Sequence, residues 1–556
     1  MKRALLAAVL ALTACAAPSS YEGLAGGTKE DAAVSAPRPV SPISVSLVAS
    51  SRPRLRWDLG SAGAAGTAPL TGAVVEMART RDFVKDVKRF EAKGTELIVP
   101  EDLDLGVWFW RLKGNASGSV GTTPSVVWEM VVRGPAAHGS SDAPTRSMVD
   151  MNSDGIADLY IAGTIDMSDP TTAPSGGSSV LTPPAGTPPT APMISFYAGD
   201  KDGGYAIGDA VAFDSEAYEG PVTIGGGIDF DGDGIPDIVR GGFTSGMQQG
   251  QTFFDVDMIF GSGSAKAPFD LNRGGPIYFA SDSTALPSVR EGGDVDGDGY
   301  GDAVVGLQDI SFVMLGNAAT GGQFGGQPAT IPMLPDRPLG KSRIALGAFD
   351  ANGDGFSDVA FSIDSTYQPG VRAFAAAGSH TQRVAEPMML EGADARLAIA
   401  FAAGDYNGDG LDDVAIATPL NDTTRICMWL GDRDKLLVKG PCIVAPAGDT
   451  EFGASLTAAD LEGDGVDELL VTAKTGAVDG TRVVRIDSSG AATVAPIGIP
   501  GIGVRLTTIW PGRPGKARWA AVAGDGTRVA VFEGADLKTS IPPTAGVIRG
   551  FGRGLR

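Results

Sequence analysis

Short stretches in which apolar and polar residues alternate occur along the chain, and long amphipathic helical patterns are sparse. Alternation with a period of two residues is typical of half-buried β-strands. It appears in PRLRWDL (53–59), AVVEMA (73–78), GVWFWRL (106–112) and SVVWEMVV (125–132). Short β-branched apolar runs such as DVAIAT (413–418) and ELLVTA (468–473) indicate buried strands. The pattern therefore predicts an all-β protein.

The first four strands predict a separate module, a small β-sandwich over residues 39–134, with two tryptophans meeting across its core. Trp57 comes early in this module, Phe83 lies midway, and a late strand contains Trp108, Trp110 and Arg111. This order resembles that of a fibronectin type III domain. Such domains usually act as spacers or adhesive units.

An acidic nine-residue motif recurs six times after this module, and a repeat of this kind is the strongest signal in the sequence. The copies, here called loops 1 to 6, are DMNSDGIAD (150–158), DFDGDGIPD (229–237), DVDGDGYGD (294–302), DANGDGFSD (350–358), DYNGDGLDD (405–413) and DLEGDGVDE (460–468). Successive copies start 79, 65, 56, 55 and 55 residues apart.

The motif has the chemistry of a calcium loop. Calcium takes six to eight oxygen ligands, and carboxylates on alternate residues of a tight turn can converge on one ion. Gly at position 6 allows the turn, and the variable position 7 would supply its backbone carbonyl. We expect up to six Ca²⁺ ions. The ligand candidates are Asp150, Asn152, Asp154, Ile156, Asp158, Asp229, Asp231, Asp233, Ile235, Asp237, Asp294, Asp296, Asp298, Tyr300, Asp302, Asp350, Asn352, Asp354, Phe356, Asp358, Asp405, Asn407, Asp409, Leu411, Asp413, Asp460, Glu462, Asp464, Val466 and Glu468.

EF-hand and dockerin loops do not fit this motif, because both need an acidic residue at position 12. That position holds Ile161, Arg240, Val305, Phe361, Ile416 and Val471. The motif also leads into predicted strands rather than helices. A solvated acidic turn does not explain six copies at this spacing.

The six copies resemble the FG-GAP repeat of integrin α-like proteins, most closely where Phe452-Gly453 leads into Asp460. The resemblance implies that each copy is one four-stranded blade of a β-propeller, with the loop between its first two strands. For the sixth blade it implies strands near 454–459, 468–473, 482–487 and 492–497. We therefore expect a seven-bladed β-propeller over residues 140–556.

Departures from the repeat refine this expectation. A degraded seventh copy around Trp510–Val522 lacks acidic ligands and should hold no calcium. Asn152, Asn352 and Asn407 lower the charge of loops 1, 4 and 5, which suggests weaker binding there, and the two glutamates of loop 6 make its geometry less certain. The Pro/Ser/Thr/Gly-rich stretch 164–192 is expected to be a disordered insertion, with a binding loop as the alternative.

The amino terminus resembles a bacterial lipoprotein signal. Lys2 and Arg3 precede an apolar stretch that is too short for a stable span, and Leu-Thr-Ala-Cys15 follows. The resemblance implies a signal peptide over residues 1–14, lipid attachment at Cys15 and an anchor in the outer membrane or at the cell surface. An ordinary secretory signal is the alternative. Residues 15–38 read as a flexible tether.

Cysteine and histidine are scarce. Cys427 and Cys442 lie in apparently adjacent strands, so they form either a disulfide or two buried thiols. The two histidines, His138 and His380, rule out a His-rich zinc site and disfavour a Ser-His-Asp triad. Motifs typical of hydrolases and zinc proteases are also missing, so the sequence predicts that the protein is not an enzyme.

The formal net charge of -22 excludes nucleic acid as a partner, because phosphates require a basic surface. The sequence thus favours a lipid-anchored, calcium-stabilised envelope protein that binds an unknown protein or carbohydrate partner. An outer-membrane assembly scaffold and a propeller-fold polysaccharide-active enzyme are the alternatives. Fold alone does not choose between them.

Overall fold

The computed structural model describes residues 29–132, apart from 49, 61–68 and 117, and residues 149–549 with gaps. The gaps are 153–155, 167–189, 201, 203, 213–222, 246–251, 265–268, 271–276, 282–287, 307–310, 318–329, 333–340, 365–370, 380–387, 391–399, 421–422, 488–489, 511–515 and 543–546. All regular elements in the described residues are β-strands, as the sequence predicts. This part of the chain therefore has no helix able to span a membrane.

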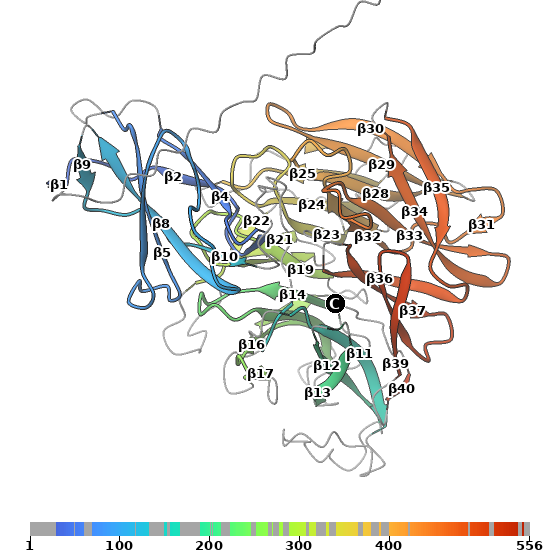
Figure 1. The fold of residues 1–556 in the computed structure, drawn as a ribbon. Helices are drawn as coiled ribbons and strands as arrows, with labels where there is room; N and C mark the ends of the chain where they lie inside the picture. The colour runs from blue at the N-terminus through green and yellow to red at the C-terminus, as the bar shows by residue number, and fades with distance from the viewer. Residues whose placement is uncertain are drawn as a thin grey trace, which may run out of the picture.

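The first ten strands form a two-layer sandwich (Figure 1). One layer has the order β1-β9-β8-β10-β3, with β5 joined to β8 and β6 joined to β5, and the other has the order β2-β4-β7. The strands of the larger layer are β1 (Lys29–Asp31), β3 (Ser46–Val48), β5 (Gly72–Ala78), β6 (Lys88–Lys93), β8 (Gly106–Ala116), β9 (Ser119–Gly121) and β10 (Trp128–Val132). Those of the smaller layer are β2 (Arg38–Ser41), β4 (Arg54–Asp58) and β7 (Glu96–Ile98).

The sandwich core contains the tryptophans that the sequence placed there. Trp57 and Trp110 belong to one buried cluster, and Trp110 meets Trp128 edge to face with ring centroids 5.6 Å apart. Two predictions need correction. Residues 29–38 are not tether, because β1 pairs with β9 and Val34 is buried. The strand at 73–78 is buried on both faces rather than half-buried, because one face packs into the core and long side chains of β6 and β8 cover Glu76 on the other.

The rest of the described chain forms seven antiparallel sheets, each of four or five strands. The first three contain β11 (Leu159–Asp166), β12 (Thr190–Gly199), β13 (Tyr205–Ala212) and β40 (Val547–Arg549); β14 (Thr223–Ile228), β15 (Asp237–Ser245), β16 (Thr252–Gly261), β17 (Phe269–Asp270) and β18 (Ile277–Ser281); and β19 (Ser288–Gly293), β20 (Asp302–Gly306), β21 (Ser311–Met314) and β22 (Thr330–Pro332).

The fourth and fifth sheets contain β23 (Lys341–Phe349), β24 (Asp358–Asp364), β25 (Val371–Ala376) and β26 (Met388–Met389), then β27 (Ala400–Gly404), β28 (Asp413–Leu420), β29 (Thr423–Asp432) and β30 (Leu436–Val444). The last two contain β31 (Asp449–Thr450), β32 (Leu456–Ala459), β33 (Glu468–Thr475), β34 (Val478–Ile486) and β35 (Ala492–Ile497), then β36 (Ile502–Trp510), β37 (Arg518–Ala523), β38 (Val529–Glu533) and β39 (Asp536–Ile541).

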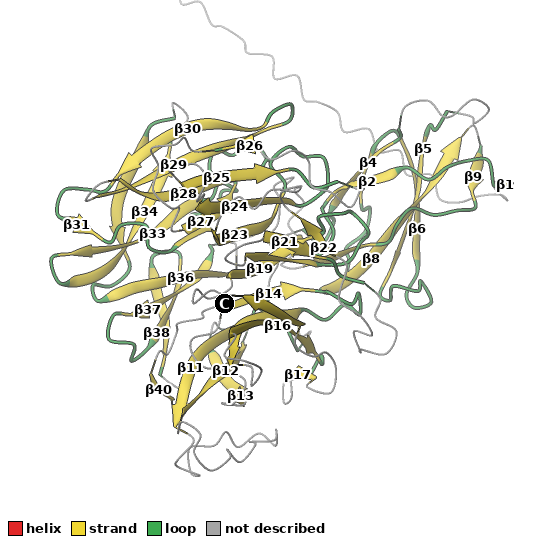
Figure 2. Ribbon diagram, turned by 180° about the vertical axis from the view of Figure 1, so that it is seen from behind, coloured by secondary structure: helices red, strands yellow, loops and turns green. Residues whose placement is uncertain are grey.

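These sheets follow one another around a common centre, which is the arrangement of a β-propeller (Figures 1 and 2). A buried apolar cluster joins each sheet to the next one, and a further cluster joins the seventh sheet to the first. The carboxyl-terminal strand β40 pairs with β11, so both ends of this region share the first sheet. The predicted all-β class and propeller architecture are confirmed.

The boundaries of the predicted insertion are wrong, because β11 extends to Asp166 and β12 begins at Thr190. The part of the insertion between these strands lies outside the described residues. The signal peptide 1–14, Cys15, the segment 16–28, Asp154, His138 and His380 lie outside them as well. Cys427 and Cys442 face each other on β29 and β30 and are joined by a disulfide.

Candidate metal centre

Loops 2 and 3 each bring three carboxylates together. Asp229, Asp231 and Asp237 offer ligand oxygens that all lie within 4.8 Å of one another, and Asp294, Asp296 and Asp302 do the same. Oxygens that share one calcium ion lie at most about 5 Å apart, because Ca–O distances are about 2.3–2.6 Å. All six residues are buried, at 9% exposure or less. The two groups therefore have the spacing needed to hold a metal ion, and the donors in each group are carboxylate oxygens.

Backbone N–H groups hold the first carboxylate of loops 2, 4, 5 and 6 in place. In loop 5, Asp405 accepts hydrogen bonds from Gly408 (2.7 Å), Asp409 (3.1 Å) and Gly410 (3.0 Å). Loops 2, 4 and 6 show the same contacts through Asp229, Asp350 and Asp460. Because these N–H groups fix the turn, the carboxylates are oriented before any ion binds.

The residue at position 9 ties the loop to its own sheet. Its carboxylate accepts the N–H of position 2, as in Asp413 with Tyr406 at 2.9 Å, and the N–H of a glycine at the end of the third strand. Sequence analysis missed these glycines, because their distance along the chain from the loop varies between sheets. They are Gly199, Gly261, Gly316, Gly378 and Gly431.

Position 8, which sequence analysis also overlooked, links loops 3 to 6 and the degraded seventh copy to the preceding loop, whereas loop 2 has Pro236 there and no N–H to donate. Its N–H donates to the carbonyl of position 1 in the preceding loop. The pairs are Gly301 with Asp229 (2.8 Å), Ser357 with Asp294 (2.9 Å), Asp412 with Asp350 (3.2 Å), Asp467 with Asp405 (2.8 Å) and Ala517 with Asp460 (2.7 Å). In three of these pairs the side chain at position 8 accepts the N–H of position 1 in return. An ion in one loop is therefore connected to the neighbouring sheet.

The amino-terminal sandwich covers part of this chain of loops. Arg81 donates to the carbonyl of Gly299 in loop 3 at 2.9 Å and lies over the Tyr300 ring at 3.9 Å. Arg38 repeats the arrangement at loop 4, with the Asp354 carbonyl at 2.6 Å and the Phe356 ring at 5.0 Å. Both figures place the sandwich against this side of the ring (Figures 1 and 2).

Position 6 shows how close this cover is. A Cβ atom on Gly299 would lie 2.0 Å from the carbonyl oxygen of Val127, and one on Gly355 would lie 2.6 Å from that of Val40. A Cβ on Gly410 of loop 5 or Gly465 of loop 6 would meet nothing within 4 Å. Loops 3 and 4 are thus covered, whereas loops 5 and 6 are open at this position.

Burial makes the ionised form of the loop carboxylates costly. It is the largest cause that raises their pKa values, and repulsion from carboxylates of the same loop adds to it. The pKa of Asp298 rises to about 6, that of Asp350 to about 7 and that of Asp413 to about 8. The pKa values of Asp294 and Asp302 rise well above their usual range. A divalent cation would restore the charged form of these groups.

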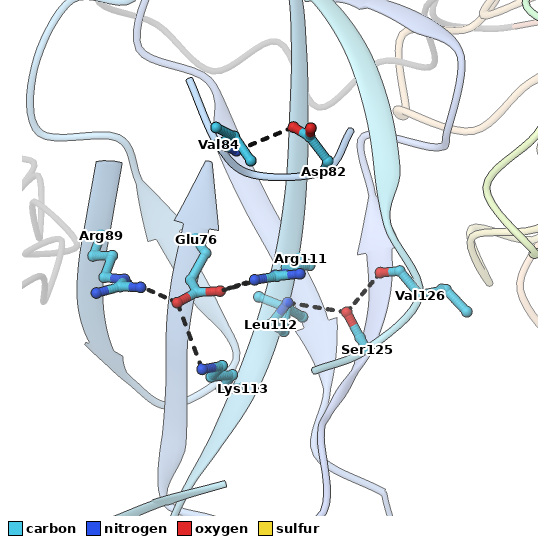
Figure 3. A network of polar contacts seen from close by, with 9 residues as sticks. All are labelled: Glu76, Asp82, Val84, Arg89, Arg111, Leu112, Lys113, Ser125 and Val126. Atoms are coloured by element: carbon cyan, nitrogen blue, oxygen red, sulfur yellow. Dashed lines mark hydrogen bonds and ion pairs between the residues drawn. The ribbon is translucent and has the colours of Figure 1, made fainter. Parts of the chain in front are cut away.

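A carboxylate in the sandwich shows the opposite solution (Figure 3). Glu76 is 2% exposed, yet Arg89 and Arg111 contact its two oxygens at 2.9 and 2.8 Å, and Lys113 lies at 3.7 Å. Burial raises its pKa, but the hydrogen bond from Arg111 and the three positive charges outweigh burial, so the net pKa is lowered. Loops 2 and 3 have no comparable set of basic side chains among their described contacts.

Loop 6 contains its own cation. Arg485 on β34 contacts Glu468 at 2.9 Å and Glu462 at 3.0 Å, so the guanidinium group lies where both predicted ligands would have to meet an ion. The predicted sixth calcium ion would therefore have to compete with Arg485 for these two side chains. In loops 4 and 5, the amides of Asn352 and Asn407 donate to Asp354 and Asp409 at 3.0 and 2.9 Å, which partly offsets their charge.

The degraded seventh copy has the register that the sequence assigns to it. Strand β37 begins at Arg518, which is position 9, and Arg518 pairs with Glu533 at 3.2 Å. In loop 1, Asp150, Asn152 and Asp158 are buried, and Asp158 accepts the N–H of Met151 at 3.0 Å. The backbone carbonyls proposed at position 7 belong to Ile156, Ile235, Tyr300, Phe356, Leu411 and Val466, and the side chains of Phe356 and Leu411 are buried.

One family model matches a part of the chain. Residues 405–471 match the FG-GAP-like repeat. This segment contains loops 5 and 6, the strand β28 after loop 5 and the first residues of β33 after loop 6. No curated protein matches the chain.

Solved structures with some likeness share little sequence with the chain. A crystal structure of rhamnogalacturonan lyase YesW is 12% identical, over 92% of this chain and 71% of that one, with a TM-score of 0.28. The Dos1 propeller is 10% identical, over 65% and 83%, with a TM-score of 0.36. A quinoprotein alcohol dehydrogenase-like protein from Bacteroides thetaiotaomicron is 8% identical, over 93% and 98%, with a TM-score of 0.31.

The prediction that the protein is not an enzyme is contradicted by these comparisons, because rhamnogalacturonan lyases recur among the similar structures. The absence of familiar hydrolase motifs does not exclude catalysis by other residues. The low TM-scores assign no activity to this chain, and the exclusion is withdrawn.

Proposed function

We propose that this protein is a calcium-stabilised β-propeller that serves as a recognition or scaffold protein of the cell envelope. The observation that carries the proposal is the pair of buried acidic groups in loops 2 and 3. Carboxylates that are buried together need a proton or a cation, and these sites offer only oxygen ligands, which calcium prefers.

Loops 2 and 3 are the strongest calcium sites in this proposal, since each has four aspartates at positions 1, 3, 5 and 9. Loops 1, 4 and 5 contain three acidic ligands and an asparagine, and should bind more weakly. Loop 6 binds none, because Arg485 takes the place of the ion. The proposal thus reduces the number of calcium ions from six to at most five.

Calcium would stabilise the ring through the contacts at position 8. An ion that fixes Asp294 also fixes its carbonyl, which accepts the N–H of Ser357 in the next loop. Ions bound in loops 2 to 5 therefore hold the sheets of these loops in register. We infer that the seven sheets are the seven blades of one ring, with the ions on the face that bears the sandwich.

A propeller presents a second set of connections at the end of each sheet opposite the calcium loops. We propose that these bind a protein or carbohydrate partner, and that the sandwich acts as a spacer. The sheet order β2-β4-β7 facing β6-β5-β8-β10 supports a fibronectin type III-like arrangement. We further propose that a lipid on Cys15 attaches the protein to the outer membrane.

The first experiment tests the metal site. Asp231→Asn and Asp296→Asn should each lower the affinity of one calcium site, measured by calorimetric titration of metal-free protein, while magnesium at equal concentration should substitute poorly. Equal affinity in wild type and both variants would refute these sites.

A second experiment tests location and partner. Cys15→Ser should move a folded protein from the membrane to the soluble fraction. Polysaccharide arrays and purified envelope proteins should then be screened with this variant in calcium and in chelator. Binding to neither class in calcium would contradict recognition, whereas binding to outer-membrane assembly proteins alone would favour the scaffold role.

A further inference from the structure

A carboxylate of the sandwich reaches loop 2. Glu129 lies on β10, where its neighbours Trp128 and Met130 point into the sandwich core. Because side chains alternate along a strand, Glu129 points out of that core, towards the propeller. Glu129 is only 2% exposed.

The Glu129 carboxyl group meets the metal loop directly. It lies against the carboxyl group of Asp229, the first ligand position of loop 2, and the two groups share a hydrogen bond when one of them is protonated. The charges of Asp233 and Asp237 act on it as well. Its oxygen Oε2 is buried and has no hydrogen-bond partner among the described residues. A buried carboxylate oxygen of this kind is costly unless a cation or proton satisfies it.

The positive charge that acts on this pair of carboxyl groups also contacts loop 3. Burial raises the pKa of both Glu129 and Asp229, and the charge of Arg81 acts to lower it. The guanidinium group of Arg81, however, donates to the carbonyl of Gly299 and lies over the Tyr300 ring in loop 3. Among the described residues, Arg81 is the basic side chain whose charge acts on both Glu129 and Asp229. This contrasts with Glu76, which has three basic partners of its own.

The other covered loops receive a different kind of contact. The sandwich presents Arg81 to loop 3 and Arg38 to loop 4, and both arginines donate to backbone carbonyls. Among the described residues, only loop 2 receives an acidic side chain from the sandwich. Loop 2 also has Arg240 at position 12, where an EF-hand would have its last carboxylate.

We propose that Glu129 is a ligand of the ion in loop 2, so that this ion joins the sandwich to the propeller. The inference rests on the calcium sites proposed above. An ion bound by loop 2 and Glu129 has ligands from two modules, and its binding therefore depends on their docking. Loop 3 lacks such a ligand and binds its ion within the propeller.

The test compares four variants of the full chain with calcium as the probe. Glu129→Gln keeps the shape but removes the charge, and Glu129→Asp keeps the charge on a shorter arm. Asp231→Asn and Asp296→Asn are matched controls for loops 2 and 3. Calcium is titrated calorimetrically into metal-free protein, and hydrogen–deuterium exchange is followed in peptides covering 126–132, 229–237 and 294–302.

The proposal expects Glu129→Gln to weaken one calcium site at least about tenfold. Calcium should then no longer slow exchange in 126–132, while 294–302 should respond as in wild type. Glu129→Asp should recover part of the affinity, and it takes over the comparison if the Gln variant does not fold.

Two other outcomes overturn the inference and separate it from the proposed function. If Glu129→Gln binds like wild type while Asp231→Asn loses a site, loop 2 binds calcium without Glu129. If wild-type protein shows no calcium-dependent protection of 229–237, both the proposed site and its sandwich ligand fail.

Discussion

The covered loops 2 to 4 and the open loops 5 and 6 share one sequence motif but differ in surroundings. Asp231 and Asp296 are buried at position 3 of loops 2 and 3, whereas Asn407 and Glu462 are exposed at the same position of loops 5 and 6. The covered loops lie against the sandwich, and loop 6 has an arginine as its cation. The difference teaches that the motif defines the ligands, while burial determines how strongly a metal ion is needed.

The largest expected effect separates two glycines at position 6. Gly299 and Gly410 both have positive φ values, of +94° and +85°, so alanine is strained at either position. We expect Gly410→Ala to cost about 1–3 kcal/mol. Gly299→Ala should cost more, because its Cβ would also displace Val127 and with it the sandwich.

Urea unfolding of both variants in saturating calcium measures this difference. Ala at residue 410 should leave hydrogen exchange in the sandwich unchanged, and Ala at residue 299 should accelerate it. Equal costs would show that the sandwich does not constrain loop 3.

Removing acidic ligands should come next in size. At free calcium about 100 times the Kd, one site contributes about 2.7 kcal/mol to the free energy of unfolding. Asp294→Asn with Asp302→Asn, and Asp405→Asn with Asp413→Asn, should each lose about that amount in calcium.

The two double variants should diverge in chelator. There the loop 3 variant should be more stable than wild type, because the substitutions remove buried carboxylates, while the loop 5 variant should change less. Denaturant titrations with and without chelator test this, and a loop 3 variant that loses stability equally in both conditions would argue against an ion in that loop.

The pH dependence of metal-free protein gives a third effect. The pKa values of Asp298, Asp350 and Asp413 rise to about 6, 7 and 8 in the folded state, above the usual value of 3.8. At pH values between the unfolded and the folded pKa of each group, the folded protein binds more protons than the unfolded chain. The free energy of unfolding should therefore fall as pH rises from about 4 to about 8.

Calcium should remove that decline, because bound carboxylates are already ionised. Unfolding free energies measured across this pH window in chelator and in calcium provide the comparison. A metal-free protein whose stability rises over the same window would show that the loop carboxylates are stabilised without an ion.

The smallest expected effect concerns loop 6. Arg485 is 41% exposed, so its ion pairs with Glu462 and Glu468 should contribute only about 0.5–1 kcal/mol. Arg485→Gln should lower stability by about that amount in chelator, and calcium should restore part of it. Lys538→Gln, which removes a surface partner of Glu533, is a control that calcium should not rescue. Calorimetry showing no additional calcium site in Arg485→Gln would contradict this account of loop 6.

Sequence analysis could predict the loops because their ligands are local. Positions 1, 3, 5, 6 and 9 lie within nine residues, so their convergence needs no knowledge of the fold. The strands of the sixth sheet also followed from the repeat, since β32, β33 and β35 begin within two residues of the expected positions.

Long-range contacts explain what was missed. Glu129, Arg81 and Arg38 reach loops that are far away in sequence, and an alternating strand such as 125–132 does not reveal what covers its outer face. Arg485 follows loop 6 by a full strand, so its pairing depends on the sheet register. Residues 29–38 resembled a tether because β1 and β2 are short and lie between Ala, Ser and Pro residues.

Counting bound calcium by equilibrium dialysis of the purified full chain, previously freed of metal, tests the central claim most directly. The account predicts at least two tightly bound ions per chain, and a loss of one ion in each of Asp231→Asn and Asp296→Asn. A folded chain that binds no calcium, and whose unfolding is unchanged by it, would contradict the account.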